Sequence, residues 1–292
     1  MERSARRVAF VLGGGGILGA SEIGMLRALF ERGIVPDLVV GTSVGAINGA
    51  FIAADPTVAA VERLTSLWSQ ASQSGVFTDS WWRQARRVAK LGTHLHSSDS
   101  LRSLVTEHLG DVTFEDLVVQ FQCVAARIET ASARWFESGA VTDAVMASCA
   151  VPGLLPAVAI DGEHYLDGGL VHSIPVARAV ALGAEEVYVL QVGRIEHPLE
   201  PPRRPWEVGM VAFEIARRHR FVEELANVPE HISLHVLPSG ADRSPSVSLG
   251  SRGARQVAVR IEQAFEASTA YLSRPLGMEE GGEPSPVTEE LP

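Results

Sequence analysis

The sequence predicts an α/β protein built on a largely parallel sheet. Short apolar runs such as VAFVL at 8–12 alternate with longer segments, such as 17–32, whose apolar residues recur at helical spacing. This alternation continues along the chain, and strands that alternate with helices favour parallel pairing. With 292 residues, of which 46% are hydrophobic, the chain is long enough to bury a sizeable core.

Turn and helix-end signals set the order of the elements. Gly33 predicts the end of the first helix, because glycine readily adopts the left-handed conformation found there. Asp161-Gly162 predicts a tight hairpin turn between two short strands. The expected strands are 8–12, 37–41, 120–128, 133–138, the hairpin 159–169, 185–193 and 232–238. The expected helices are 17–32, 44–54, about 56–70, two within 72–112, 142–150, 175–184, 208–226 and 254–272. Residues 275–292 are rich in Gly, Pro and Glu and are expected to be disordered, which leaves a single domain over 1–274.

Composition excludes several classes of function. A net charge of −10 argues against nucleic-acid binding, which needs a basic surface. Cys123 and Cys149 are too few for a disulfide framework and are expected to be buried core residues of a cytoplasmic protein. No apolar run is long enough for a transmembrane helix. His94 and His96 lack acidic or cysteine companions, so neither a metal nor a cofactor is expected.

Four glycines directly follow the first expected strand, and three interpretations of them are considered first. Gly14, Gly16 and Gly19 fit a dinucleotide-binding pattern, but that pattern also needs an acidic residue at the end of the second strand, where VVGT stands instead. A phosphate-binding loop needs Gly-Lys-Ser/Thr, and the chain's lysine lies far away at Lys90. A tight turn in which glycine serves packing alone is the third possibility.

The segment GTSVG at 41–45 favours a fourth function, acyl transfer. It fits G-x-S-x-G between a buried strand and a helix of small residues, the sharp turn that lifts a serine above the edge of a sheet. In a parallel sheet both strands end at the same edge, so the amides of Gly14, Gly15 and Gly16 are expected near the Ser43 hydroxyl. Such amides stabilise the oxyanion of a tetrahedral intermediate by about 3–4 kcal/mol per donor.

Ser43 needs a general base, and the residues leave two candidates open. His164 and His172 could form a Ser-His-Asp triad. Asp167 stands in LDGG at 166–169, and an aspartate between a short strand and two glycines can point into a site from a tight turn.

Three motifs together carry a resemblance to a known family. GGGGILG at 13–19, GTSVG at 41–45, and ASCAVPGLLPAVAIDGEHY at 147–165 followed by LDGG resemble, in that order, the patatin-like phospholipases. The similarity covers roughly 7–193. It implies a patatin-like three-layer α/β/α fold and a serine acyl hydrolase with a Ser–Asp dyad and no catalytic histidine. By this resemblance Ser43 is the nucleophile, Asp167 the base, Gly13, Gly14, Gly15 and Gly16 the oxyanion hole, and Gly41, Gly45, Gly168 and Gly169 the glycines that support these motifs.

One position departs from the family pattern. The glycine loop of the family commonly carries Arg or Lys before its last glycine, whereas this chain has Leu18, so any role of that cation is lost.

The segment 81–92, WWRQARRVAKLG, places basic and aromatic residues along one helix and is either an ordinary packed helix or a peripheral contact with a lipid surface.

The sequence therefore predicts a phospholipase A-like or lysophospholipase-like esterase that acts on lipid or other acyl esters through an acyl-enzyme. Three alternatives remain open at this point. They are a catalytically silent lipid-binding or regulatory protein, a Ser-His-Asp esterase, and an acyltransferase.

Overall fold

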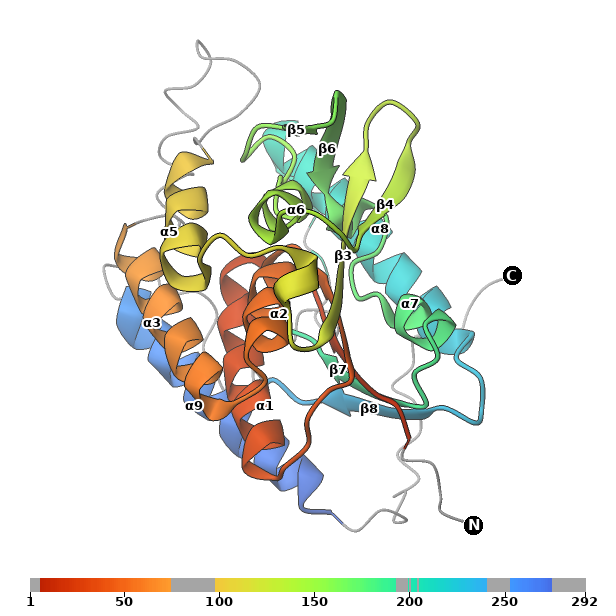
Figure 1. The fold of residues 1–292 in the computed structure, drawn as a ribbon. Helices are drawn as coiled ribbons and strands as arrows, with labels where there is room; N and C mark the ends of the chain where they lie inside the picture. Colours follow the sequence, from red (N-terminus) through yellow and green to blue (C-terminus); the bar gives the residue numbers. More distant parts are fainter. Residues whose placement is uncertain are drawn as a thin grey trace.

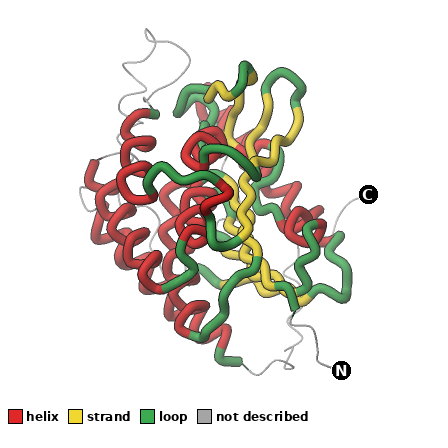
Figure 2. Tube along the Cα trace, viewed as in Figure 1, coloured by secondary structure: helices red, strands yellow, loops and turns green. Residues whose placement is uncertain are grey.

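The computed structural model describes residues 6–74, 98–192, 199, 201–203, 205–240 and 253–274, and it places an eight-stranded sheet between two layers of helices (Figure 1). Figure 2 shows the strands as a yellow band between the helices. The strands are β1 (Val8–Leu12), β2 (Leu38–Thr42), β3 (Gln120–Arg127), β4 (Ser132–Phe136), β5 (Val158–Ile160), β6 (Glu163–Asp167), β7 (Glu186–Leu190) and β8 (Ser233–Leu237).

The central strands are parallel, as expected. They lie in the order β3-β2-β1-β7-β8, while β4, β5 and β6 are antiparallel to their neighbours. The hairpin between β5 and β6 turns at Asp161 and Gly162, which both have positive φ, 52° and 82°. Two successive positive φ values define the type I′ turn that Asp-Gly favours, so the prediction is confirmed.

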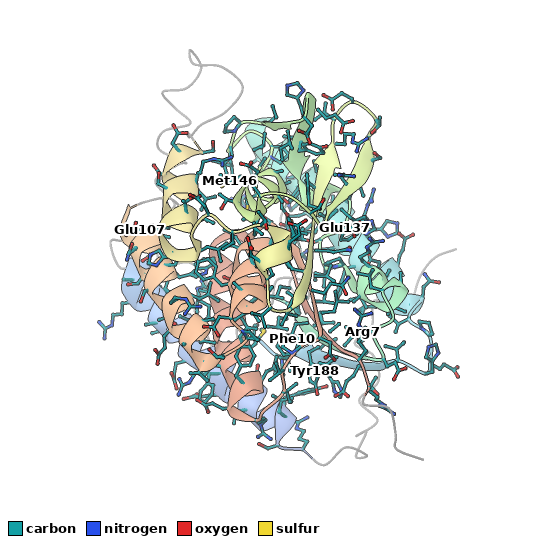
Figure 3. The ribbon with its side chains drawn as sticks, in the orientation of Figure 1. Arg7, Phe10, Glu107, Glu137, Met146 and Tyr188 are labelled. Carbon is teal, nitrogen blue, oxygen red and sulfur yellow. The ribbon has the colours of Figure 1, made fainter. Side chains whose placement is uncertain are left out.

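Helices cover both faces of the sheet, and each face has its own apolar core. Phe10 and Leu12 of β1 point toward one core, and Ala9 and Val11 toward the other, because successive side chains of a strand alternate. Phe10 packs edge to face on Tyr188 of β7 (Figure 3). The first face is covered by α1 (Ala20–Glu31), α2 (Val44–Ala54), α3 (Val58–Ser74), α5 (Asp99–Leu109), α6 (Val141–Ser148) and α9 (Gly253–Leu272), and the second by α7 (Val176–Ala181) and α8 (Pro205–Ala226).

Some boundaries differ from those expected. The first helix does not start at residue 17, because Gly16 has φ 59° and the chain makes a short 3-10 turn over Gly16–Gly19 before α1 begins. One of the two helices expected within 72–112 is α5, and α3 extends to Ser74. The segment 81–92, together with Lys90, His94 and His96, lies outside the described residues. The tail 275–292 also lies outside them.

The register of β3 brings two distant strand ends together. Val124 pairs with Thr42 of β2 and with Trp135 of β4, and the next residue, Ala125, pairs with Asp167 of β6 and with β4 again. Because β4 occupies one edge of β3 at both positions, β2 and β6 share the other edge. The two strands run toward each other along that edge and end at consecutive positions of β3. The turn after Thr42 therefore faces the turn after Asp167.

A buried polar network fixes the start of α1 beside the glycine loop. Asn48 donates to the Gly19 carbonyl at 3.1 Å and to Glu22 Oε2 at 2.7 Å, and it accepts from Trp68 Nε1 at 2.9 Å. Glu22 is 0% exposed, and this burial raises the pKa of its carboxyl well above the ordinary value. The Glu22 carboxyl therefore binds its proton more tightly in the folded protein than in the unfolded chain.

Replacing Glu22 with glutamine is expected to remove a loss of stability at higher pH. A carboxyl whose pKa is raised by folding binds more protons in the folded state, so the free energy of unfolding falls as pH rises above the unfolded pKa. Glutamine has the same shape but does not titrate. The Tm of Glu22→Gln and that of the parent are measured between pH 5 and 8. The difference between them should change steadily in favour of the variant as the pH rises. A difference in Tm that stays constant across this range would contradict the assignment.

Candidate active site

Ser43 is the single residue between the end of β2 and the start of α2, at the apex of the turn. Its backbone has φ 55° and ψ −123°, a conformation that costs a residue with a Cβ about 1–3 kcal/mol. The Ser43 amide donates to Ser148 Oγ at 2.8 Å, and Ser148 Oγ donates to the Val124 carbonyl at 2.6 Å. This chain of hydrogen bonds ties the strained turn to β3 and fixes the direction of the serine hydroxyl.

The two flanking glycines of GTSVG are required by close contacts between main chains. A Cβ on Gly41 would lie 2.5 Å from the Gly45 carbonyl oxygen, and a Cβ on Gly45 would lie 2.4 Å from the Leu12 carbonyl oxygen. Both distances are far below van der Waals contact. The absence of a Cβ at these two positions thus lets α2 pass close to β1 and β2.

Asp167 meets the serine from the end of β6. The Ser43 hydroxyl donates to Asp167 Oδ2 at 2.6 Å, and the Gly169 amide donates to Oδ1 at 2.7 Å. A Cβ on Gly168 would lie 2.1 Å from the Val124 carbonyl oxygen, so only glycine lets this turn approach β3. Both carboxylate oxygens are therefore fixed, one on the hydroxyl and one on the turn that carries the aspartate.

Burial sets the acidity of Asp167. The residue is 1% exposed, and its pKa is raised from 3.8 to about 6, chiefly by the loss of solvation. Hydrogen bonds from Ser43 and Gly169 and the positive charge of Arg217 act in the opposite direction. A carboxylate with this pKa is ionised at neutral pH and is a stronger base than an exposed aspartate, which suits it to accept the serine proton.

The glycine loop lies against Ser43, but not all its amides are free. A Cβ on Gly14 would lie 3.4 Å from Ser43 Cβ, so the loop touches the serine. The amides of Gly13 and Gly14 donate to the carbonyls of Leu190 and Ser173 at 3.1 and 2.9 Å. They are engaged in the scaffold, which corrects the expectation that all four amides face an oxyanion. Among the described residues, no hydrogen bond occupies the amides of Gly15 and Gly16.

The two candidate histidines bind glutamates rather than the serine. The His164 ring is 2.7 Å from Glu129 and more than half exposed, and the His172 ring is 2.8 Å from Glu224. The hydroxyl of Ser43 bonds directly to a carboxylate. Among the described residues, the geometry thus gives a direct Ser–Asp pair and no Ser-His-Asp arrangement.

Of the other residues near the site, Ser148 was not singled out by the sequence. Ser148 and Cys149 come from the end of α6, inside the stretch ASCAVPG that carried part of the resemblance. Cys149 and Cys123 are both buried free thiols, as expected. Burial and the charge of Asp167 raise the pKa of the Cys149 thiol, which keeps it neutral. Leu18 is buried, so its side chain belongs to the core.

Within its described residues the chain shows neither a metal cluster nor a membrane-spanning helix. No three His, Cys, Asp or Glu side chains of that part of the chain gather closely enough to hold a metal ion. None of its helices combines the length and apolarity that a membrane span requires.

Comparisons with known proteins add to this geometry. Lysophospholipase nte1 of Emericella nidulans is 32% identical over 191 residues, 65% of this chain but 12% of that protein. Lysophospholipase NTE1 of Phaeosphaeria nodorum is 33% identical over 199 residues, 66% of this chain and 13% of that protein. The chain thus spans about an eighth of the length of these relatives.

Two solved structures are also matched. VipD from Legionella pneumophila is 14% identical with a TM-score of 0.44, and the match covers 92% of this chain and 67% of VipD. The ExoU–SpcU complex from Pseudomonas aeruginosa is 18% identical with a TM-score of 0.44, covering 92% of this chain and 52% of the other.

The model of the patatin-like phospholipase family matches residues 10–180, a span that contains the glycine loop, Ser43 and Asp167. The chain belongs to the patatin-like phospholipase family.

Proposed function

We propose that this protein is a serine-dependent lipid acyl hydrolase in which Ser43 and Asp167 form the catalytic dyad. The 2.6 Å hydrogen bond from the Ser43 hydroxyl to the buried Asp167 carboxylate carries the proposal. A serine on a strained turn, joined to a base whose pKa is raised to about 6, is the arrangement of an activated nucleophile.

The acylation step follows from this geometry. The Ser43 oxygen attacks the ester carbonyl carbon while its proton passes to Asp167 Oδ2. The carbonyl oxygen gains the negative charge, and the amides of Gly15 and Gly16 donate to it. When the intermediate collapses, the bond to the alcohol breaks and Asp167 returns the proton to the leaving oxygen. The products are an acyl-serine and the free alcohol.

Deacylation repeats these roles with water. Asp167 takes a proton from water, whose oxygen attacks the acyl carbon. The second tetrahedral intermediate collapses, the serine oxygen regains the proton from Asp167, and the fatty acid leaves. No metal or cofactor enters either step, because the serine and the carboxylate supply both the nucleophile and the proton transfer.

Lysophospholipids and phospholipids are the substrates that we propose. The relatives bear the name lysophospholipase, and the family is that of the patatin-like phospholipases. Ester-bound acyl chains of membrane lipids are the chemical feature that these names share. A peripheral contact with a lipid surface through 81–92 is part of the same proposal.

Labelling with a fluorophosphonate tests the nucleophile without knowledge of the substrate. The Ser43 oxygen attacks phosphorus and displaces fluoride, so intact mass should show one adduct, and peptide mapping should place it on Ser43. Release of fatty acid from lysophosphatidylcholine, measured by chromatography, then tests the substrate class. His164→Ala and His172→Ala should keep both the adduct and the turnover.

Each control has a defined meaning. Ser43→Ala should take no label and release no fatty acid while keeping its Tm within a few degrees of the parent. A folded parent protein that takes no label would refute an activated Ser43 and favour a lipid-binding protein. Loss of labelling in a folded histidine variant would favour a triad.

A further inference from the structure

A buried arginine reaches the glycine loop from a helix that lies outside the region matched by the family model. Arg217 of α8 is 4% exposed, although an arginine is ordinarily at the surface. One turn earlier on the same helix, Phe213 packs against Gly169, with its ring 2.9 Å from the position of an added Cβ. The helix thus packs directly onto the turn that carries Asp167, on the face of the sheet covered by α7 and α8 (Figure 1).

The guanidinium of Arg217 binds the main chain of the glycine loop at the Gly14 carbonyl. Its Nη1 donates to the Gly14 carbonyl at 2.6 Å and to Ser173 Oγ at 3.2 Å, and its Nη2 donates to Glu214 at 3.1 Å. The Gly14 amide donates to the Ser173 carbonyl at 2.9 Å. Both polar groups of Gly14 are therefore fixed, one by Ser173 and the other by a positive charge.

Peptide geometry gives this contact a direction. The carbonyl of Gly14 and the amide of Gly15 belong to one peptide group, and the described peptide bonds are all trans. In a planar trans peptide the C=O and N–H bonds point in opposite directions. A guanidinium that fixes the Gly14 carbonyl on one side therefore fixes the Gly15 N–H on the opposite side. A charge-assisted hydrogen bond to the carbonyl also polarises the peptide and strengthens its N–H as a donor.

From this we infer that Arg217 is a positioning residue, which orients and polarises the Gly14–Gly15 peptide so that the Gly15 amide serves the oxyanion. This rests on the function proposed above. The loop segment 13–19, GGGGILG, has no charged side chain of its own, so the positive charge beside it comes from α8. Arg217 would thus supply, from a distant part of the chain, the positive charge that is missing at Leu18.

The same charge acts on the base. Among the described residues, the ionisable groups that act on Asp167 or are acted on by it are Arg217 and the Cys149 thiol at the end of α6, and Glu214 pairs with the arginine. Arg217 lowers the pKa of Asp167, and the thiol stays neutral. Removing the arginine charge should raise that pKa, so the acid limb of the pH–rate profile, which follows ionisation of the base, should move to higher pH.

Three variants of the full chain test the inference. For each variant, kcat, KM and the pH profile are measured with a soluble ester as substrate. Labelling with a fluorophosphonate gives the fraction of active protein. Arg217→Gln should lower kcat about 10–100-fold with little change in KM, less than the 10²–10³-fold for loss of a whole oxyanion donor, and should move the acid limb to higher pH. Arg217→Lys should also lower kcat, because one ammonium lacks the planar fork, but it should keep the acid limb in place. Arg218→Gln removes the neighbouring arginine that also pairs with Glu214 and should leave both quantities unchanged.

The outcomes separate this inference from the function on which it rests. Turnover by the parent protein and its loss in Ser43→Ala decide the proposed function first. Once the parent protein has shown turnover, Arg217→Gln and Arg218→Gln are compared. If the two variants had the same kcat and the same acid limb, the inference would be overturned. If Arg217→Gln does not fold, Arg217→Lys decides, and an unchanged kcat per labelled site in that variant would overturn it.

Discussion

Replacing Asp167 with asparagine is expected to lower kcat for ester hydrolysis by about 10²–10⁴-fold, the range typical of a lost general base. An amide has almost the same size as the carboxylate and can still hydrogen-bond to Ser43, but it cannot accept the serine proton. The variant should fold, because a neutral amide is cheaper to bury than a carboxylate. Fatty acid release at pH 7.5, normalised to folded protein, measures the effect.

The hairpin offers a matched control for this change. Asp161→Asn makes the same chemical substitution in the exposed turn of the same hairpin, where the residue has φ 52°. Asparagine tolerates this conformation well, so activity and Tm should stay at the parent values. If Asp167→Asn kept more than about a tenth of the parent kcat, Asp167 would not be the base.

Replacing Gly45 with alanine is expected to destabilise the protein by about 3 kcal/mol or more and to abolish activity. The added Cβ would lie 2.4 Å from the Leu12 carbonyl oxygen and 2.8 Å from the Gly13 carbonyl oxygen. These atoms belong to the backbone, and overpacking that side chains cannot relieve exceeds the usual 1–3 kcal/mol. The strain would push α2 away from the end of β1, and Ser43 would move with the helix. Denaturant unfolding and turnover measure the two effects.

Gly49→Ala provides the comparison within the same helix. It lies one turn later, and its added Cβ would meet side-chain atoms of Val39 and Phe121 at 3.0 and 3.1 Å, which can shift. Alanine also favours a helix over glycine by about 1 kcal/mol, so the net change should be within about 1 kcal/mol of zero. Equal destabilisation by the two substitutions would show that contact with the backbone at Gly45 does not matter.

Much of the fold could be predicted from sequence because its signals are local. The apolar run of β1, the Gly33 helix end and the Asp161-Gly162 turn depend on residues close together in the chain, and all were found as expected. Ser43 could be proposed as the nucleophile for the same reason, since the strand, the turn and the helix that position it are consecutive. Asp167 could be proposed as the base by resemblance, because its distance from Ser43 depends on how β6 pairs.

The parts that could not be predicted depend on pairings between distant residues. The amides of Gly13 and Gly14 are occupied by carbonyls of Leu190 and Ser173, residues that lie more than 150 positions along the chain. Arg217 carried no local signal, since a basic residue on a helix is ordinarily solvated. Its burial follows from the packing of α8 on the turn after β6, which sequence spacing does not reveal.

The shared edge of β3 has a consequence for the order in which the protein becomes active. Ser43 and Asp167 are 124 positions apart, and they meet because β2 and β6 end at consecutive residues of one strand. A chain in which β2 and α2 have formed but β6 has not docked carries the serine without its base. During synthesis or refolding, esterase activity should therefore return no earlier than the docking of β6 on β3. With the proposed function, the chain would therefore leave membrane lipids intact until β6 has docked and Asp167 has reached Ser43.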